Sequence, residues 1–342
     1  MLQFFTHVLA PILFGCLCIT AAQVLKRLVM KGKKISPLQF CIGAFAAATG
    51  MFGVIYVLTW GFSIPNVLPG FWSAVCYGSA ANIAIQFMNA KAASIDEGEV
   101  SLTAPIQAMT PGLITVFALT LGEFPGTIGV LGVIFMMCGS YVLLWAKKPE
   151  RWYEYFGPLQ RLRNLMHLRE LDAAERGKTI VVYLSLGSAA VGTVGLLFDG
   201  LYTRRSVNMQ GIFLGAMAMT ALLTAFYVLW YSMRPDATES QRREFSVIRT
   251  RGVWGFLVLW GLVWIAHIYF IQPTFAATFV AYVGTLKRFS ILFSVLSGYF
   301  FFREKEFAKR LWASIFIIAG AICISLDEIP RRVADHMAGM GF

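Results

Sequence analysis

Residues 209–232 read MQGIFLGAMAMTALLTAFYVLWYS and contain no charged side chain. A transmembrane helix needs about 20 consecutive, mainly apolar residues to cross the hydrocarbon core of a bilayer. This stretch of 24 residues is therefore long enough and apolar enough for one membrane span. It does not suit a membrane β-strand, in which apolar and polar residues alternate over about ten positions.

Nine further segments have the same continuously apolar character, which predicts an all-α membrane protein with ten transmembrane helices. The ten run from Phe4 to Leu25, Pro37 to Trp60, Val67 to Lys91, Gly98 to Leu121, Pro125 to Ala146, Thr179 to Gly200, Met209 to Ser232, Gly252 to Gln272, Phe275 to Phe302 and Leu311 to Leu326.

The composition of the whole chain agrees with a membrane protein. Of its 342 residues, 58% are hydrophobic and 14% are charged, whereas soluble domains are about 45–50% apolar and about 25% charged. These proportions exclude a soluble enzyme, a disordered chain, a nucleic-acid binder and a disulfide-stapled secreted module.

No catalytic or cofactor-binding motif is present. The sequence lacks a Walker A loop, an H-E-x-x-H helix and a G-x-S-x-G turn. The four histidines are scattered, and the six cysteines lie in apolar segments without a CxxC pair. We therefore expect no enzymatic activity, no cofactor and no metal.

Basic residues alternate between the loops, and this pattern predicts the orientation. Connections after the odd-numbered spans hold 23 of the 29 Lys and Arg residues, and the other connections with both termini hold 4. Because positively charged loops stay in the cytoplasm, we expect both termini outside. The chain is predicted to be a multi-pass protein of a bacterial inner membrane.

The polar linker at residues 147–178 divides the chain into two five-span halves, at residues 1–146 and 179–326, followed by a tail at 327–342. Because five is odd, a duplicated half sits inverted in the membrane, as in many secondary transporters. A shift of 181 positions aligns Gln86 with His267 and Gln107 with Arg288, although it yields few identities. The linker suits either an interfacial amphipathic helix or a plain solvated connector.

Two basic residues, Lys287 and Arg288, lie inside the predicted ninth span. A charge at bilayer depth costs about 2.5–3.5 kcal/mol on the insertion scale, so it normally faces a bundle interior or an aqueous cavity. An anion is expected to meet this pair, supplied either by Asp199 or by a cargo. A lysine beside the planar arginine fork suits phosphate. The alternative is that the pair only links helices through carbonyls and waters.

Polar residues at comparable depth in other spans are candidates for the same cavity or for ordinary interhelical hydrogen bonds. Asp199 with Arg204 and Arg205 is a candidate gate or coupling group, or else an interfacial ion pair. The remaining candidates for substrate binding are Asn82 and Gln86 in the third span, Gln107 in the fourth and His267 in the eighth.

The ten spans resemble the drug/metabolite transporter superfamily, specifically its EamA-type repeats. The resemblance rests on Pro111 to Gly122-Glu123 and, more closely, on residues 281–290 (AYVGTLKRFS) and 302–305 (FREK). Residues 281–290 are also similar to the ninth span of triose-phosphate translocators, whose adjacent Lys-Arg holds the substrate phosphate. That resemblance implies the same role for Lys287 and Arg288 and adds Tyr282 as a candidate.

One position departs from the translocator pattern. Those proteins have a lysine in an I-K-A-L-E-P run, and the matching residues here, 106–111, read IQAMTP, with Gln107 in place of that lysine. This substitution argues against a three-carbon phosphate as cargo but is compatible with another anionic cargo. The charge count also places the termini opposite to the orientation described for most members of the superfamily.

The leading hypothesis is a secondary-active transporter of an anionic, phosphate-containing metabolite or lipid head group, working by alternating access. The alternatives are an exporter of amino acids, drugs or other small metabolites, and a non-transporting scaffold or accessory subunit. Expected partners are the anionic solute, membrane lipid and a coupling proton or exchanged anion. A monomer and a homodimer are both open.

Overall fold

The computed structural model describes residues 5–32, 35–95, 126–143, 172–233 and 251–287, together with short runs between 289 and 327. Every regular element in these parts is helical, and the one extended pairing is an isolated bridge between Val67 and Ser206. The elements are η1 (Phe5–Leu9), α2 (Ala10–Gly32), α3 (Pro37–Trp60), α4 (Phe71–Ser94), α7 (Thr127–Leu143), α9 (Ala173–Arg205), α10 (Met209–Ser232), α12 (Arg251–Ile271), α13 (Thr274–Ala277) and α14 (Val280–Leu286).

Among the described residues, five helical segments are long and apolar enough to cross a membrane, which agrees with an integral, multi-pass membrane protein. They are Phe5–Met30, Pro37–Trp60, Thr179–Arg205, Met209–Ser232 and Val253–Ala277.

Local sequence signals set the starts of the two helices whose bounds match the prediction. Ser36 caps α3 by accepting a hydrogen bond from the Gln39 amide, and the Gln39 side chain accepts one from the Ser36 amide. Asn208 caps α10 in a similar way, through the Gly211 amide at 3.0 Å. Such caps satisfy amide groups that have no partner within the first helical turn.

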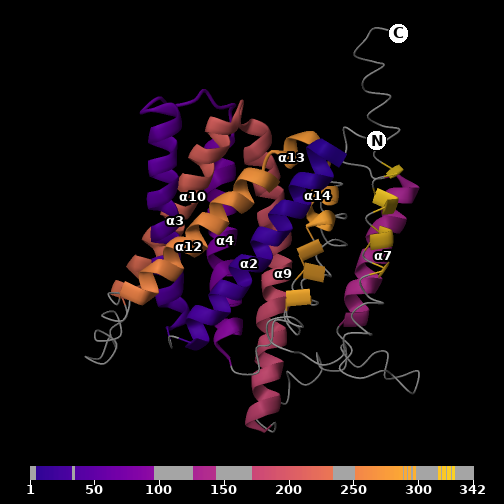
Figure 1. Cartoon of the computed structure of the whole chain (residues 1–342), viewed down its shortest axis with the longest axis horizontal. Coiled ribbons are helices and arrows are strands. Elements are labelled where there is room, and N and C mark those ends of the chain that lie inside the picture. Colours follow the sequence, from indigo (N-terminus) through magenta and orange to yellow (C-terminus); the bar gives the residue numbers. More distant parts are fainter. Residues whose placement is uncertain are drawn as a thin grey trace.

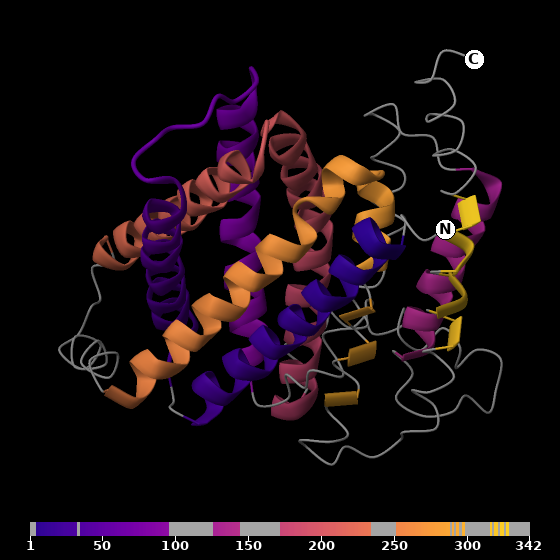
Figure 2. The same ribbon diagram turned by 45° about the horizontal axis from the view of Figure 1, so that its top comes forward.

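The helices form a bundle in which segments far apart in sequence lie side by side (Figures 1 and 2). Helix α4 packs along α9, α3 along α10, and α12 along both α2 and α3. Helix α7 lies beside the short helical runs 318–320 and 322–324, where a Cβ added to Gly132 would come within 2.6 Å of the Gly320 carbonyl oxygen. The two backbones can approach this closely because both residues are glycine.

The predicted ninth span differs from expectation because the chain is broken near its start. Thr278 and Phe279 are extended, with ψ of 179° and 142°, so the helix resumes at Val280 instead of running on from Phe275. The break leaves carbonyl groups without helical partners, and Arg204 donates to two of them, those of Phe275 and Thr278. The hydropathy pattern contains no trace of this interruption.

Other bounds also differ. Helix α2 continues to Gly32, past the predicted end at Leu25, and α9 extends to Ala173 and Arg205 beyond both predicted limits. Hydropathy windows stop at charged residues, whereas a helix continues as long as its backbone hydrogen bonds are satisfied. The predicted fourth span and most of the 147–178 linker lie outside the described residues.

Candidate functional site

A cavity of about 210 Å³ lies between α2, α3, α4, α9, α10 and α12 and is also lined by Lys287 and Ser290, which follow α14. Its wall is partly apolar, with the aromatic residues Phe45, Trp260 and Trp264. Its polar and charged lining residues are Gln23, Lys26, Asn82, Gln86, Asn89, Ser188, Asp199, Tyr202, Thr220, His267, Gln272, Lys287 and Ser290. A polar cavity at the centre of an apolar helix bundle is the expected form of a solute-binding site.

Lys287 reaches this cavity because two side chains of α2 hold the backbone around it. The Cys16 thiol contacts the Lys287 carbonyl at 3.3 Å, and the Thr20 hydroxyl contacts the Ser290 carbonyl at 3.2 Å. The Lys287 ammonium lies 5.8 Å from the centre of the Phe275 ring. The lysine is thus positioned by α2, although it lies more than 260 residues away in sequence.

Asp199 lines the same cavity, and its carboxylate and the Lys287 ammonium attract one another electrostatically. Of the two anion sources expected for Lys287, the protein's own carboxylate therefore lines the same cavity. One carboxylate oxygen, Oδ1, is buried without a hydrogen-bond partner among the described residues. Buried acceptors are nearly always paired in folded proteins, so this oxygen is an exception within the cavity wall.

Two further cavity residues carry buried polar atoms without a partner in the described part of the chain. They are the indole Nε1 of Trp260 and the ring Nδ1 of His267. Together with Asp199, three side chains of one cavity therefore have an unused hydrogen-bonding atom. Buried polar atoms are nearly always paired in folded proteins, but these three lie within the wall and are not open to the cavity.

The cavity brings together four of the predicted substrate-binding residues, Asn82, Gln86, His267 and Lys287. The Asn82 amide nitrogen donates to the Gly78 carbonyl at 3.0 Å and contacts the Met219 sulfur at 3.5 Å. Gln86 and His267 are 8% and 5% exposed, so each has little contact with anything but protein and cavity.

Another predicted substrate-binding residue is placed outside the cavity. Tyr282 is buried in the core between α14 and α7, and its hydroxyl is hydrogen-bonded to Asp327 instead of facing the cavity. Gln107 and Arg288 lie outside the described residues.

The structure separates Asp199 from the two arginines grouped with it as a gate. Arg204 donates to the carbonyls of Phe275 and Thr278 at 3.0 and 3.2 Å, and Arg205 donates to the Pro69 carbonyl at 2.6 Å. Both arginines thus tie the end of α9 to neighbouring segments, while Asp199 lies in the cavity.

This end of the bundle carries further cross-links between segments. The Thr203 hydroxyl donates to the Gln272 side chain at 2.9 Å, and the Gln210 amide donates to the Ser63 hydroxyl at 2.9 Å. Together with the arginines they close the bundle where α9 passes into α10. We refer to the bonds of Thr203, Arg204, Arg205 and Gln210 as the latch.

Replacing Arg204 with alanine is expected to destabilise the latch more than replacing Arg205. Arg204 is partly buried and makes two bonds to carbonyls that the broken helix leaves unpaired, whereas Arg205 is exposed and its bond competes with water. Charged hydrogen bonds contribute about 1.5–3 kcal/mol each, so Arg204→Ala should lower the melting temperature by about 5 °C or more. Thermal unfolding followed by tryptophan fluorescence measures this, and equal losses in Arg204→Ala and Arg205→Ala would contradict it.

Sequence reasoning missed part of the cavity wall. Lys26 was expected in a cytoplasmic loop, but it lies on α2 inside a candidate span and faces the cavity. A charge close to a span boundary looks like a loop charge, and only the extra helical turns of α2 show otherwise. Gln23, Asn89 and Trp260 were also missed, since a single amide or indole in an apolar segment does not indicate which way it points.

Comparisons with known proteins support the fold and name no function. No protein-family model and no curated protein matches the chain. One solved chain, described only as "Crystal structure of protein", matches with a TM-score of 0.59 at 17% identity, covering 93% of this chain and 98% of its own. The helical architecture therefore occurs in a protein of clearly different sequence.

Proposed function

We propose that the protein is a secondary-active transporter that moves a small anionic, phosphate-bearing metabolite or lipid head group through its central cavity by alternating access. The observation that carries this proposal is the polar cavity itself, which Lys287 and Asp199 both line within an apolar bundle. Intramembrane charges that line a cavity commonly mark a substrate or ion pathway. We assign the phosphate to Lys287 and, from the sequence, to Arg288.

The size of the cavity suits a small cargo. Its volume of about 210 Å³ is sufficient for a small metabolite or a lipid head group.

Asp199 gives the transporter a means of coupling. In the empty cavity its carboxylate balances the charge of Lys287, and an arriving phosphate takes its place. The displaced carboxylate then accepts a coupling proton, or else an exchanged anion restores the balance during the return step. Either route avoids leaving an unbalanced charge in the membrane interior.

The helix contacts support the two inverted five-helix repeats. In such a repeat the first, second and third spans (α2, α3 and α4) are equivalent to the sixth, seventh and eighth (α9, α10 and α12). The contact between α4 and α9 is then equivalent to the contact between α12 and α2, and the contact between α3 and α12 to that between α10 and α4. The contact between α3 and α10 joins two equivalent helices. Gln86 and His267, aligned by the shift of 181 positions, both line the cavity.

We further propose that the chain is a drug/metabolite transporter of the EamA type in a bacterial inner membrane, with both termini outside. A cysteine in the linker tests the orientation. In a variant without native cysteines, Gln160→Cys is expected to resist an impermeant thiol reagent in intact cells and to react after permeabilisation. Labelling in intact cells would reverse the orientation.

An exporter of amino acids is the second candidate, and the presence of Asp199 in the cavity favours it. A zwitterionic solute places its ammonium at Asp199 and its carboxylate at Lys287, so both charges of the cavity are used. The non-transporting scaffold has no comparable support, because it requires no polar cavity.

Uptake into proteoliposomes distinguishes these functions. Purified protein is reconstituted and assayed with radiolabelled erythrose 4-phosphate, phosphoethanolamine and leucine, each with and without a proton gradient. Saturable uptake of either phosphate compound supports the proposal, and uptake of leucine alone supports the second candidate. Protein-free vesicles provide the control, and a lack of uptake of all three solutes argues against transport of either class.

A further inference from the structure

One face of α9 forms part of the cavity wall. Its lining residues follow one another at intervals of three or four positions, which is the spacing of a single helix face. They include Ser188, Gly192, Gly195, Asp199 and Tyr202. Gly192 precedes Asp199 by seven residues, or about 10 Å at about 1.5 Å per residue. The cavity therefore continues along α9 from the carboxylate, past two positions that carry no side chain.

The two glycines differ in what surrounds them. A Cβ added to Gly195 would lie 3.1 Å from Cδ1 of Ile85 and 3.6 Å from the Cβ of Ala81, so this glycine allows α4 to approach α9 closely. A Cβ added to Gly192 would meet no described atom within 4 Å. Close packing of helices thus explains the glycine at position 195 but not the one at position 192.

The backbone does not require a glycine at position 192 either. Helix α9 is continuous from Ala173 to Arg205, and within the described residues only Gly61 and Gly70 have a positive φ. Glycine stabilises the interior of a helix less than alanine does, because it loses more backbone freedom on folding. The consequence of Gly192 lies in the cavity, where it leaves open space beside the backbone of α9.

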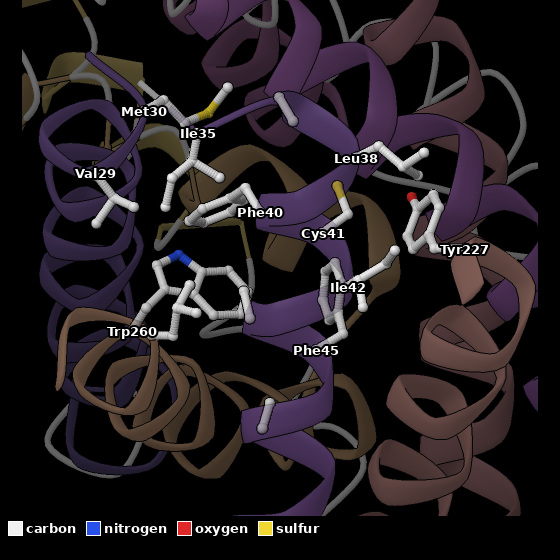
Figure 3. Packing of buried hydrophobic residues seen from close by; sticks show 14 of the residues in the cluster. Val29, Met30, Ile35, Leu38, Phe40, Cys41, Ile42, Phe45, Tyr227 and Trp260 are labelled. Atoms are coloured by element: carbon white, nitrogen blue, oxygen red, sulfur yellow. The ribbon is translucent and has the colours of Figure 1, made fainter. Parts of the chain in front are cut away.

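The aromatic part of the cavity wall belongs to other helices and is closely packed. Phe45 of α3 and Trp260 of α12 lie 5.3 Å apart between ring centroids, with 87° between their planes, and Trp264 stacks on Trp260 at 5.1 Å. Figure 3 shows Phe45 and Trp260 within a cluster of buried side chains that also includes Phe40. Because close-packed side chains have little room to recede, a larger solute needs space where the wall lacks a side chain.

We propose that Gly192 determines the size of solute that the cavity accepts. The Lys287 ammonium interacts electrostatically with Asp199, so an acidic group bound at Lys287 leaves the space beside Gly192 to the rest of the solute. This inference rests on the proposed transport through the cavity and adds the position that limits the length of the cargo.

Two phosphonates that share their acidic group and differ in their alkyl chain test the inference. Binding of methylphosphonate and butylphosphonate to the purified full-length protein is measured by calorimetry. Gly192→Val should weaken butylphosphonate binding by about 10-fold or more, because one methylene group too many in a closed pocket has an effect of about that size. It should change methylphosphonate binding by about 2-fold or less. Equal changes for the two compounds, or no change for either, would overturn the inference.

Gly50→Val is the matched control for this substitution. Gly50 lies within α3, and a Cβ added there would also meet no described atom within 4 Å, but the residue is exposed and does not line the cavity. The same valine should therefore leave both affinities unchanged. A selective loss of butylphosphonate binding in Gly50→Val would contradict the assignment to position 192.

Thermal unfolding separates open space from a packing contact. Gly192→Val should unfold within about 2 °C of the wild-type protein, whereas Gly195→Val should unfold at a clearly lower temperature, because its side chain meets Ile85. If Gly192→Val loses as much stability as Gly195→Val, position 192 is a packing contact and the inference is wrong.

The outcomes also distinguish this inference from the proposed function. If the wild-type protein binds both phosphonates and Gly192→Val shows no dependence on chain length, the size limit alone is wrong. If the wild-type protein binds neither, the proposed anion transport fails, and uptake of alanine and leucine then tests the size limit. Only leucine uptake should be slowed in Gly192→Val, and leucine uptake equal to wild type, or no uptake of either amino acid, would overturn the inference.

Discussion

Proteoliposomes that contain Lys287→Gln are expected to take up the phosphorylated solute about 100-fold more slowly than wild-type vesicles. The glutamine keeps most of the length and polarity of the side chain but removes the positive charge that the anion needs. Removing one partner of a buried, hydrogen-bonded charge pair costs about 2–5 kcal/mol, and about 1.4 kcal/mol corresponds to a factor of ten. Initial rates of uptake measure the effect directly.

Matched variants separate loss of binding from loss of protein. Lys287→Arg retains the charge and should retain part of the uptake, although the wider fork does not reproduce the geometry of an ammonium group. Lys91→Gln removes an exposed lysine and should leave the rate unchanged. Unchanged uptake of every phosphorylated solute in Lys287→Gln would exclude Lys287 from anion binding.

The second large effect concerns the stability of the Asp199–Lys287 pair. Each single replacement, Asp199→Asn or Lys287→Gln, leaves one charge unbalanced in the bundle interior, whereas the double replacement leaves none. Because both residues border a cavity, the cost of each single change should lie between about 1 kcal/mol, for an exposed pair, and about 3–5 kcal/mol, for a buried one. The double variant should be more stable than the sum of the single changes predicts.

Unfolding of the four proteins in detergent, followed by tryptophan fluorescence, gives the coupling free energy of the pair. The control cycle combines Asp199→Asn with Lys91→Gln, and the two effects should add because Lys91 is exposed and does not line the cavity. Strictly additive losses in the Asp199–Lys287 cycle would mean that the carboxylate and the ammonium do not stabilise one another.

The outcomes for individual helices show what hydropathy can predict. Pro37–Trp60 and Met209–Ser232 match α3 and α10 at both ends, because a capping residue and an uncharged segment coincide there. The end of α2 and the break before α14 were missed. In both places the backbone departs from hydropathy, first by continuing past charged residues and then by interrupting an apolar segment without a glycine or proline at the break.

The candidate site was predictable only in part, because hydropathy singles out a charge only where it lies deep within an apolar segment. Lys287 stood out because a charge within an apolar segment is costly wherever it lies. Lys26 did not, because the same charge near a helix end has an inexpensive alternative in the loop. Tyr282 was included as a neighbour of Lys287 in a family-like sequence, yet it packs into the core and its hydroxyl bonds to Asp327.

The sequence by itself determined that this protein is helical and belongs in a membrane. Those properties follow from the lengths of its apolar segments and from the backbone hydrogen bonds that a lipid environment requires. Only the tertiary structure decided that Asp199 and Lys287 line one cavity, that Lys26 and Trp260 border the same cavity, and that the arginines of α9 bond to carbonyls. These contacts join residues of different helices, and their existence depends on how each helix is rotated and where it ends.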